Sequence, residues 1–173
     1  VTRVAETANG AGDASTFNSS EGVLMAEISS LVLVDTVRLI SINDGSSNNE
    51  IFIGLRSNTG NIYYNIDTNG STQSSFISNV NPFNSFCKIC IKYKENDIEF
   101  FVNGFKLYSD TSAIMPNNLN GIDMKRGNGS LPFYGNTKQI QYFDSALNDS
   151  DLEKITSWTS FTDLANGQTY SIK

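Results

Sequence analysis

The stretch Gly135-Asn-Thr-Lys-Gln-Ile-Gln-Tyr-Phe-Asp-Ser-Ala-Leu-Asn-Asp-Ser-Asp-Leu152 changes its periodicity half-way and decides the fold. In its first half, Ile140 and Tyr142 alternate with glutamines, a period of two that is typical of a half-buried strand. The second half opens with Asn148, a good N-cap residue, and places acidic residues where the first turn of a helix favours them. We therefore predict a strand followed by a short helix, and we expect a sheet to receive the apolar stripe of that helix: Leu152, Ile155 and Trp158.

The rest of the chain reads as strands separated by turns. Clusters of Asn, Ser and Gly recur at short intervals between segments that alternate in hydrophobicity. Ten strands and no long helix indicate an all-β, mostly antiparallel sandwich, and 173 residues suit one domain, 1–173. The predicted strands are 22–28, 36–43, 50–56, 61–67, 73–78, 86–94, 97–103, 105–109, 121–125 and 137–143.

The predicted hairpin at Phe101-Val-Asn-Gly104, together with the strand and acidic helix described above, resembles the end of a laminin-G-like, or concanavalin A-like, lectin/glucanase domain. The resemblance is most specific over 86–157 and implies a jelly-roll β-sandwich. Residues 161–173 lie outside the shared pattern and are expected to be a C-terminal extension. The segments Gly22–Ile28 and Arg38–Gly45 are similar to the first strands of phage tail proteins that carry this domain.

This resemblance implies a function. It implies a non-catalytic, lectin-like module of a phage tail or virion structural protein that contributes to attachment to host-surface glycans. The expected partners are carbohydrate or other virion proteins, and the expected location is the virion or the extracellular space. A purely structural domain that decorates a tail is the alternative within the same reading.

Composition excludes several other classes of function. The chain has no His, which removes Ser-His, Cys-His and His-metal arrangements. Its net charge is −6, so a nucleic-acid partner is not expected. No stretch approaches the ~20 apolar residues of a membrane helix, and the first residues lack the apolar run of a signal peptide. We expect a soluble chain without membrane insertion, cut from a longer parent protein through which it would form any homo-oligomer.

The strand 86–94 carries two cysteines and three lysines. Cys87 and Cys90 are three residues apart, which puts their thiols on opposite faces of a strand, so we expect two free thiols. The three lysines share the face of Cys90 and predict a solvated sheet edge: Lys88, Lys92 and Lys94.

Alternation also predicts a candidate ligand site on an outward face. If Ile51, Ile53 and Leu55 point inward with their partners on the next strand, aromatic and polar neighbours point outward. An exposed aromatic beside Arg and Asn is suited to stacking on a sugar ring and to hydrogen bonding its hydroxyls. Surface aromatics without function, or aromatics covered by loops, are the alternative. The candidate residues are Phe52, Arg56, Tyr63 and Asn65.

A β-glucanase-type hydrolase is an alternative function. Related glucanases carry Glu-x-Asp-x-Glu on their active strand, and Glu95, Asp97 and Glu99 match that pattern. Two carboxyl groups about 5 Å apart would give retaining hydrolysis. The flanking strands, however, require Glu95 and Asn96 as the loop of a hairpin, which argues against a catalytic groove at this place.

Calcium is the remaining cofactor to consider, because lectin-like relatives hold it with Asp and Asn oxygens. Asp44, Asn48 and Asn49, or Asp67 with Asn69, offer such oxygens. Turns closed by Asx side chains are the competing use of these residues. No other cofactor is expected.

Overall fold

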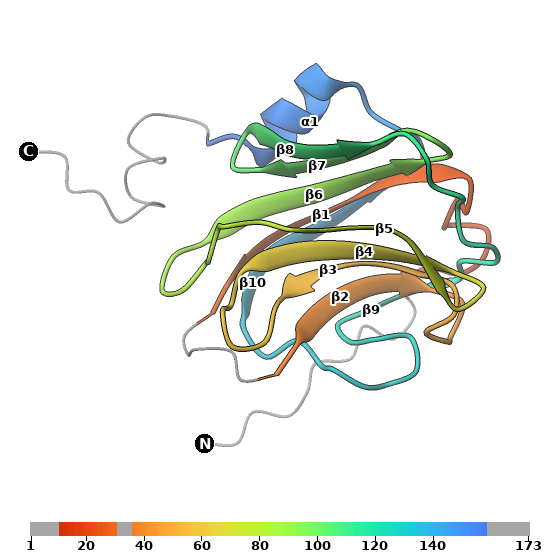
Figure 1. Cartoon of the computed structure of the whole chain (residues 1–173), viewed down its shortest axis with the longest axis horizontal. Coiled ribbons are helices and arrows are strands. Elements are labelled where there is room, and N and C mark those ends of the chain that lie inside the picture. Colours follow the sequence, from red (N-terminus) through yellow and green to blue (C-terminus); the bar gives the residue numbers. More distant parts are fainter. Residues whose placement is uncertain (1–10, 31–35, 159–173) are drawn as a thin grey trace, which may run out of the picture.

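The computed structural model describes residues 11–30 and 36–158, so the expected extension at 161–173 lies outside the described residues. The described chain forms ten strands and one short helix in two stacked layers (Figure 1). The elements are β1 (Glu21–Ser29), β2 (Arg38–Asn43), β3 (Glu50–Leu55), β4 (Ile62–Thr68), β5 (Ser71–Ile77), β6 (Cys87–Lys94), β7 (Ile98–Val102), β8 (Phe105–Asp110), β9 (Gly121–Asp123), β10 (Asn136–Phe143) and α1 (Asp149–Thr156). The predicted all-β class and all ten strands are confirmed.

The strands pair in two five-stranded antiparallel sheets. The first sheet has the order β10-β1-β6-β7-β8 and the second the order β5-β4-β3-β2-β9. Ile51, Ile53 and Leu55 point inward as predicted and lie in the main core between the sheets, to which β4, β6 and β7 also contribute alternate side chains. No helix of the described residues is long and apolar enough to cross a membrane.

One side of the sandwich is closed by aromatic side chains. The Phe76 ring of β5 stacks on the Tyr108 ring of β8, with 4.6 Å between centroids, and Tyr64 packs against Phe100 at 5.0 Å. The hydroxyls of Tyr64 and Ser74 are 2.8 Å apart, and Ser74 Oγ donates to Asp110. Ring packing and a hydrogen-bonded seam therefore tie the two sheets together along this side.

Helix α1 covers the outer face of the first sheet (Figure 1). The Asn148 side chain accepts a hydrogen bond from the Asp151 backbone N–H, which confirms the predicted N-cap. Leu152 is fully buried and packs with Ile155 against an apolar cluster of the sheet: Val23, Met25, Cys90 and Phe101. Trp158 lies beyond the end of α1, where Lys88 Nζ sits 5.4 Å from its ring centroid.

The cysteine prediction is confirmed and the lysine prediction is corrected. Cys87 belongs to the main core and Cys90 to the cluster under α1, and both thiols are free. The predicted solvated edge is wrong, because β6 is the middle strand of its sheet and α1 packs over its outer face. Lys92 is consequently buried, Lys88 donates to the Ser157 carbonyl, and only Lys94 keeps a largely exposed side chain.

The turn between β7 and β8 requires a glycine. Asn103 and Gly104 adopt φ values of 50° and 84°, the left-handed pair that a two-residue hairpin favours. A Cβ on Gly104 would also lie 2.6 Å from Ser157 Oγ, at the end of α1. We expect Gly104→Ala to lower the free energy of unfolding by about 1–2 kcal/mol. Urea denaturation tests this against Gly121→Ala, where φ is ordinary and no atom lies within 4 Å, and equal effects of the two changes would contradict the argument.

Candidate ligand-binding face

The predicted ligand residues lie on the outer face of the second sheet. In the ladder between β3 and β4, Phe52 faces Asn65 and Gly54 faces Tyr63. The rings of Phe52 and Tyr63 meet edge to face, with 5.3 Å between centroids and an interplanar angle of 77°. Arg56 follows the last residue of β3 and is exposed. The structure thus brings Phe52, Tyr63 and Asn65 together, with Arg56 at one end of the group.

The predicted exposure of the two aromatics is wrong. Phe52 is 5% exposed and Tyr63 is 7% exposed, because they form a small outer core with Leu39, onto which Val37 and Leu131 pack. Three adjacent apolar side chains on one outer face are costly to leave in water, and covering them recovers about 25 cal/mol per Å² of apolar surface. The segment 124–135, between β9 and β10, supplies much of this cover.

Arg126 fastens that segment to the sheet. Its Nε donates to Glu50 Oε1 at 2.6 Å and its Nη2 donates to Asp67 Oδ2 at 3.2 Å. The neighbouring Gly127 N–H donates to Glu50 Oε2 at 3.3 Å, and a Cβ on Gly127 would collide with the Ser46 carbonyl at 2.0 Å. Burial raises the pKa of Glu50 above its ordinary value, and Arg126 offsets only part of that rise. The cluster is therefore a clamp in which one guanidinium binds two carboxylates.

Three polar groups beside the clamp keep their hydrogen-bonding capacity. The Arg56 guanidinium, the Tyr63 hydroxyl and the Asn65 amide make no side-chain hydrogen bond to any part of the chain that the structure describes. The Tyr63 hydroxyl is not fully buried, so it also reaches solvent. Burial raises the pKa of Tyr63 to about 12, so this hydroxyl is a donor at neutral pH. Ile77, which pairs with Tyr63 and is 45% exposed, adds an apolar surface beside them.

Sequence reasoning missed three contributors to this face. The outward position of Ile77 could have been predicted from the sequence, because Ile77 follows Phe76 on β5 and alternation turns the two side chains to opposite faces. No sequence pattern indicates the positions of Arg126 and Leu131, because they lie in a segment without periodicity and reach the sheet only through the tertiary fold.

The glucanase-like carboxylates do not line a common groove. Glu95 is exposed in the β6–β7 turn, where Asn96 has a φ of 58°, which confirms the predicted hairpin loop. Asp97 lies 2.7 Å from Lys92 Nζ. Glu99 is buried on the outer face of the first sheet and is ion-paired with Lys92 and Lys106. Asp97 and Glu99 therefore serve to neutralise lysines near α1.

The residues considered for calcium close a turn. Asp44 Oδ1 accepts from the backbone N–H and the hydroxyl of Ser46, and Asp44 Oδ2 accepts from the Asn49 amide at 2.9 Å. The Asn48 carbonyl accepts from the Gly70 N–H, and Asn49 Oδ1 accepts from the Asn69 N–H. The bonds from Ser46 to Asp44 are the expected Asx-type hydrogen bonds, and those from Asn69 and Gly70 join this turn to the β4–β5 turn. Calcium binding at Asp44, Asn48 and Asn49 stays a prediction.

Comparison with known proteins places the fold. No protein-family profile matches this sequence, and no curated protein matches it. Among solved structures, the CBM40 domain of a Ruminococcus gnavus IT-sialidase superposes with a TM-score of 0.69 at 15% identity, over 91% of this chain and 96% of that one. The chain is a jelly-roll β-sandwich.

Two further structures extend this likeness. Domain 4 of AbnA, an extracellular GH43 arabinanase from Geobacillus stearothermophilus, gives a TM-score of 0.65 at 12% identity, over 90% of this chain and 82% of that one. A heptameric SAP-like pentraxin from Limulus polyphemus gives 0.64 at 9% identity, over 83% of this chain and 72% of that one. The CBM40 domain was also solved with α2,3 sialyllactose, and the AbnA domain with arabinotriose. At such low identities the likeness concerns the fold alone.

Proposed function

We propose that this chain is a non-catalytic glycan-binding module, and that the sugar binds the outer face of the second sheet at Arg56, Tyr63 and Asn65. The observation that carries the proposal is the group of three unpaired polar side chains beside Ile77 on one rigid sheet. Carbohydrate-bound jelly rolls among the structural neighbours support it.

The chemistry of the face suits a sugar ring. The C–H surface of a pyranose packs on an apolar side chain, and Ile77 offers one that is partly exposed. Hydroxyls of the ring need donors and acceptors placed at its edge. Arg56 and the Tyr63 hydroxyl are donors, and the Asn65 amide is both donor and acceptor. The Phe52 ring packs edge to face against the Tyr63 ring, which limits the movement of the ring that carries the hydroxyl.

We further propose that the parent protein is a phage tail or virion component, and that the module helps it to attach to host-surface glycans. A face that offers a few hydrogen bonds gives weak binding per copy, and many copies on one particle convert weak binding into firm attachment. A glycan array with the isolated chain, including sialyllactoses and arabino-oligosaccharides, tests the binding step. If the array shows no binding, even with dissociation constants in the millimolar range, the result would favour a structural domain that decorates a tail by protein contacts.

We expect Arg56→Ala and Asn65→Ala each to weaken binding of the best array ligand by about tenfold, since each removes a hydrogen bond worth about 1–1.5 kcal/mol. Titration calorimetry measures the change. Lys154→Ala is the matched control, because Lys154 is exposed on α1, over the other sheet, and among the described residues it pairs only with Asp151. Unchanged affinity in both variants would place the ligand elsewhere.

A further inference from the structure

Arg56 carries an uncompensated positive charge at one end of the proposed ligand face. Its side chain is exposed and makes no ion pair or hydrogen bond with the residues that the structure describes. Six other cations of the described residues are held by carboxylates: Lys92, Lys94, Lys106, Arg126, Lys138 and Lys154. A guanidinium has N–H donors in a planar fork and no acceptor, so Arg56 remains open to a ligand that accepts hydrogen bonds.

The turn that carries Arg56 is braced by hydrogen bonds. The Arg56 N–H donates to the Asn61 carbonyl at 2.9 Å, and the Gly60 N–H donates to the Arg56 carbonyl at 2.9 Å. The side-chain amide of Asn81, in the segment after β5, donates to the Thr59 carbonyl. The backbone that holds the guanidinium is therefore fixed before a ligand arrives, which lowers the entropy lost on binding.

Asn61 places a second free donor beside Arg56. These two residues continue the ladder between β3 and β4, whose last rung pairs Leu55 with Ile62. Alternation puts Asn61 on the outer face with Tyr63, and its side-chain amide makes no hydrogen bond with the described part of the chain. Successive outward residues of one strand are about 7 Å apart, so one sugar ring with a substituent can reach both Tyr63 and Asn61.

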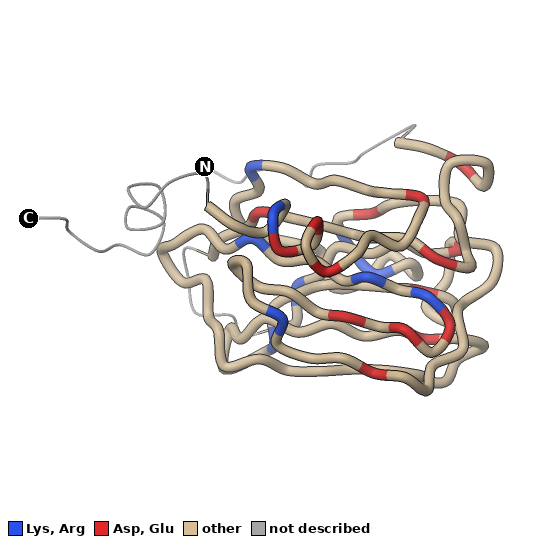
Figure 2. The backbone as a smooth tube through the Cα atoms, turned by 90° about the horizontal axis from the view of Figure 1, so that it is seen from above, with Lys and Arg blue, Asp and Glu red and all other residues tan. Residues whose placement is uncertain are grey.

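The carboxylates of the face lie at its other end. Glu50 and Asp67 form the first rung of the β3–β4 ladder, and Arg56 follows the last. The stretch of β3 from Glu50 to Arg56 spans about 20 Å at roughly 3.3 Å per residue, whereas exposed charges are screened over about 8 Å at physiological salt. Strand β3 points to the left in Figure 1, and Figure 2, which keeps the same left and right, shows most of the described Asp and Glu toward the right. These carboxylates therefore do not compensate the charge of Arg56.

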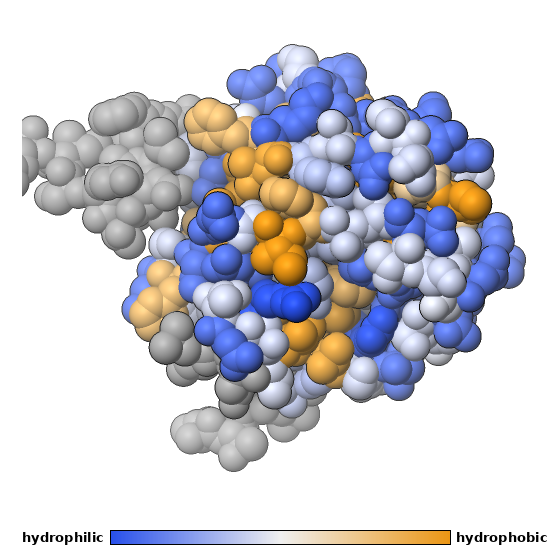
Figure 3. Space-filling view, in the orientation of Figure 1, coloured by the Kyte–Doolittle hydropathy of each residue, from blue (hydrophilic) through white to orange (hydrophobic). Residues whose placement is uncertain are grey.

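Arg56 acts together with the Tyr63 hydroxyl and an apolar side chain. Burial is the main influence on that hydroxyl and raises its pKa to about 12, whereas the positive charge of Arg56 acts in the opposite direction. Ile77 pairs with Tyr63 and is 45% exposed, so apolar surface adjoins both groups. Figure 3 shows apolar atoms beside hydrophilic ones on the left half of the molecule. A sugar ring with an acidic substituent needs this combination, because its C–H groups pack on apolar surface and its acid binds a cation.

We propose, on the basis of the glycan site proposed above, that its ligand is an acidic glycan whose carboxylate or sulfate group binds the Arg56 guanidinium beside the Asn61 amide. The planar fork of Arg56 donates two parallel N–H bonds to two oxygens of the acid. The ring then lies over Ile77. The clamp at the other end of the face offers an acid no free guanidinium, since Arg126 is bound to two carboxylates. The glycan therefore binds in one direction, with its acid toward Arg56.

Pairs of glycans that differ only in the acidic group test the class of ligand. Lactose is compared with sulfated lactose and with sialyllactose, and an oligogalacturonate with its methyl ester, on an array probed with the full chain. The sulfate and carboxylate members show which acid the site prefers. We expect the acidic member of each pair that binds to bind about tenfold more tightly, since hydrogen bonds to charged groups are roughly twice as strong. Raising the salt from about 10 mM to about 1 M is expected to remove most of this preference, because it shortens the screening length about tenfold.

Charge variants locate the acidic group. Arg56→Gln removes the charge and keeps an amide donor, so it is expected to bind the acidic and neutral members of a pair equally. Arg56→Lys keeps the charge without the planar fork and is expected to retain part of the preference. Lys154→Gln makes the same change of charge on α1, over the other sheet, and is expected to keep the full preference. Both residues are exposed, so all three chains are expected to fold, which circular dichroism checks.

The possible outcomes separate the class of ligand from the glycan site itself. If the wild-type chain binds glycans but binds both members of each pair equally, the acidic class is overturned and the glycan site stands. A preference for acidic members that survives Arg56→Gln would overturn the assignment of the acid to Arg56. If no glycan of the array binds, the proposed function is overturned and the acidic class with it.

Discussion

Phe100→Ala is expected to lower the free energy of unfolding by about 3–5 kcal/mol, the cost of removing a buried aromatic ring from a packed core. Phe100 is fully buried on β7, and its ring contacts Tyr64 at 5.0 Å and Phe76 at 6.3 Å between centroids. The ring joins the two sheets beside the side of the sandwich that Phe76 and Tyr108 close. Its loss leaves a cavity that the two stiff aromatic neighbours cannot fill.

Phe105→Ala is the matched control for this prediction. Phe105 is the same residue type, begins the neighbouring strand β8, and is 70% exposed. Its change is expected to stay within about 0.5 kcal/mol. Urea denaturation at low protein concentration measures both variants. A Phe100→Ala chain that loses less than about 1 kcal/mol would mean that the core between the sheets is not packed as described.

The side chains that lie between the two sheets could be predicted from the sequence because one physical rule determines them. Each strand turns every second side chain into the space between the sheets, so the alternation of apolar residues marks the strand and its inward face. Ile51, Ile53 and Leu55 obey the rule and are buried in the main core. The turns are marked as well, since Asn96, Asn103 and Gly104 all adopt positive φ at hairpin ends.

The burial of the outward-facing side chains could not be predicted, because the sequence of a strand does not determine which other segment covers it. Phe52 and Tyr63 do point outward as alternation predicts, yet Leu131 and Val37 cover them. Lys92 sits on the outer face of β6 and is buried by the helix and its ion pairs. In both cases the cover comes from a segment distant in sequence, whose position only the complete fold determines. The same limit applies to the ligand face, where Arg126 arrives from such a segment.

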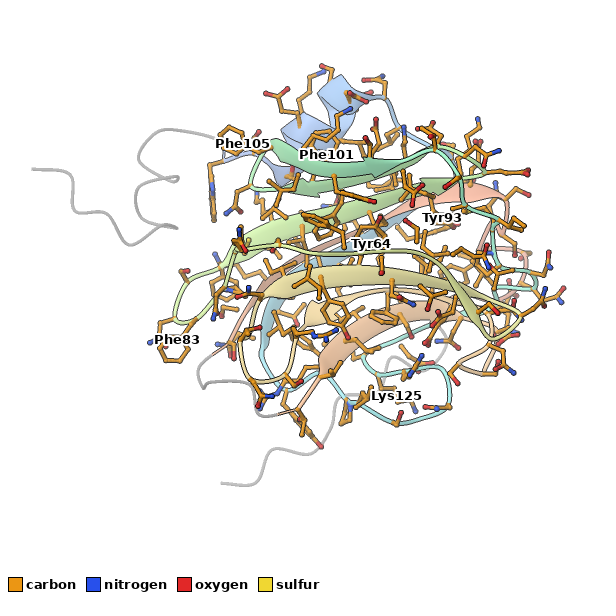
Figure 4. All side chains as sticks on the ribbon, viewed as in Figure 1. Tyr64, Phe83, Tyr93, Phe101, Phe105 and Lys125 are labelled. Carbon is orange, nitrogen blue, oxygen red and sulfur yellow. The ribbon has the colours of Figure 1, made fainter. Side chains whose placement is uncertain are left out.

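Arg126→Ala is expected to lower the free energy of unfolding by about 3 kcal/mol at pH 7, the lower end of the cost of stripping a buried carboxylate of its partner. Glu50 has no exposed surface and loses the guanidinium that neutralises it, whereas Arg126 itself is partly exposed. Segment 124–135 also loses its fastening to the sheet, which loosens the cover over Phe52. Lys125→Ala is the matched control, since Lys125 is the preceding residue and its side chain makes no ion pair with the described residues (Figure 4).

The effect of Arg126→Ala is expected to depend on pH, with a definite sign. Burial raises the pKa of Glu50 in the folded chain, so stability falls as the pH rises from the unfolded value toward the folded one. Without Arg126 the pKa of Glu50 in the folded chain rises further, so more folding stability is lost at pH values above that pKa. The stability difference from wild type should therefore be small near pH 4 and reach its full size near pH 7. Adding Glu50→Gln to Arg126→Ala should restore part of the stability at pH 7 and remove this pH dependence. A difference of equal size at both pH values would show that the carboxylate of Glu50 is not what Arg126 stabilises.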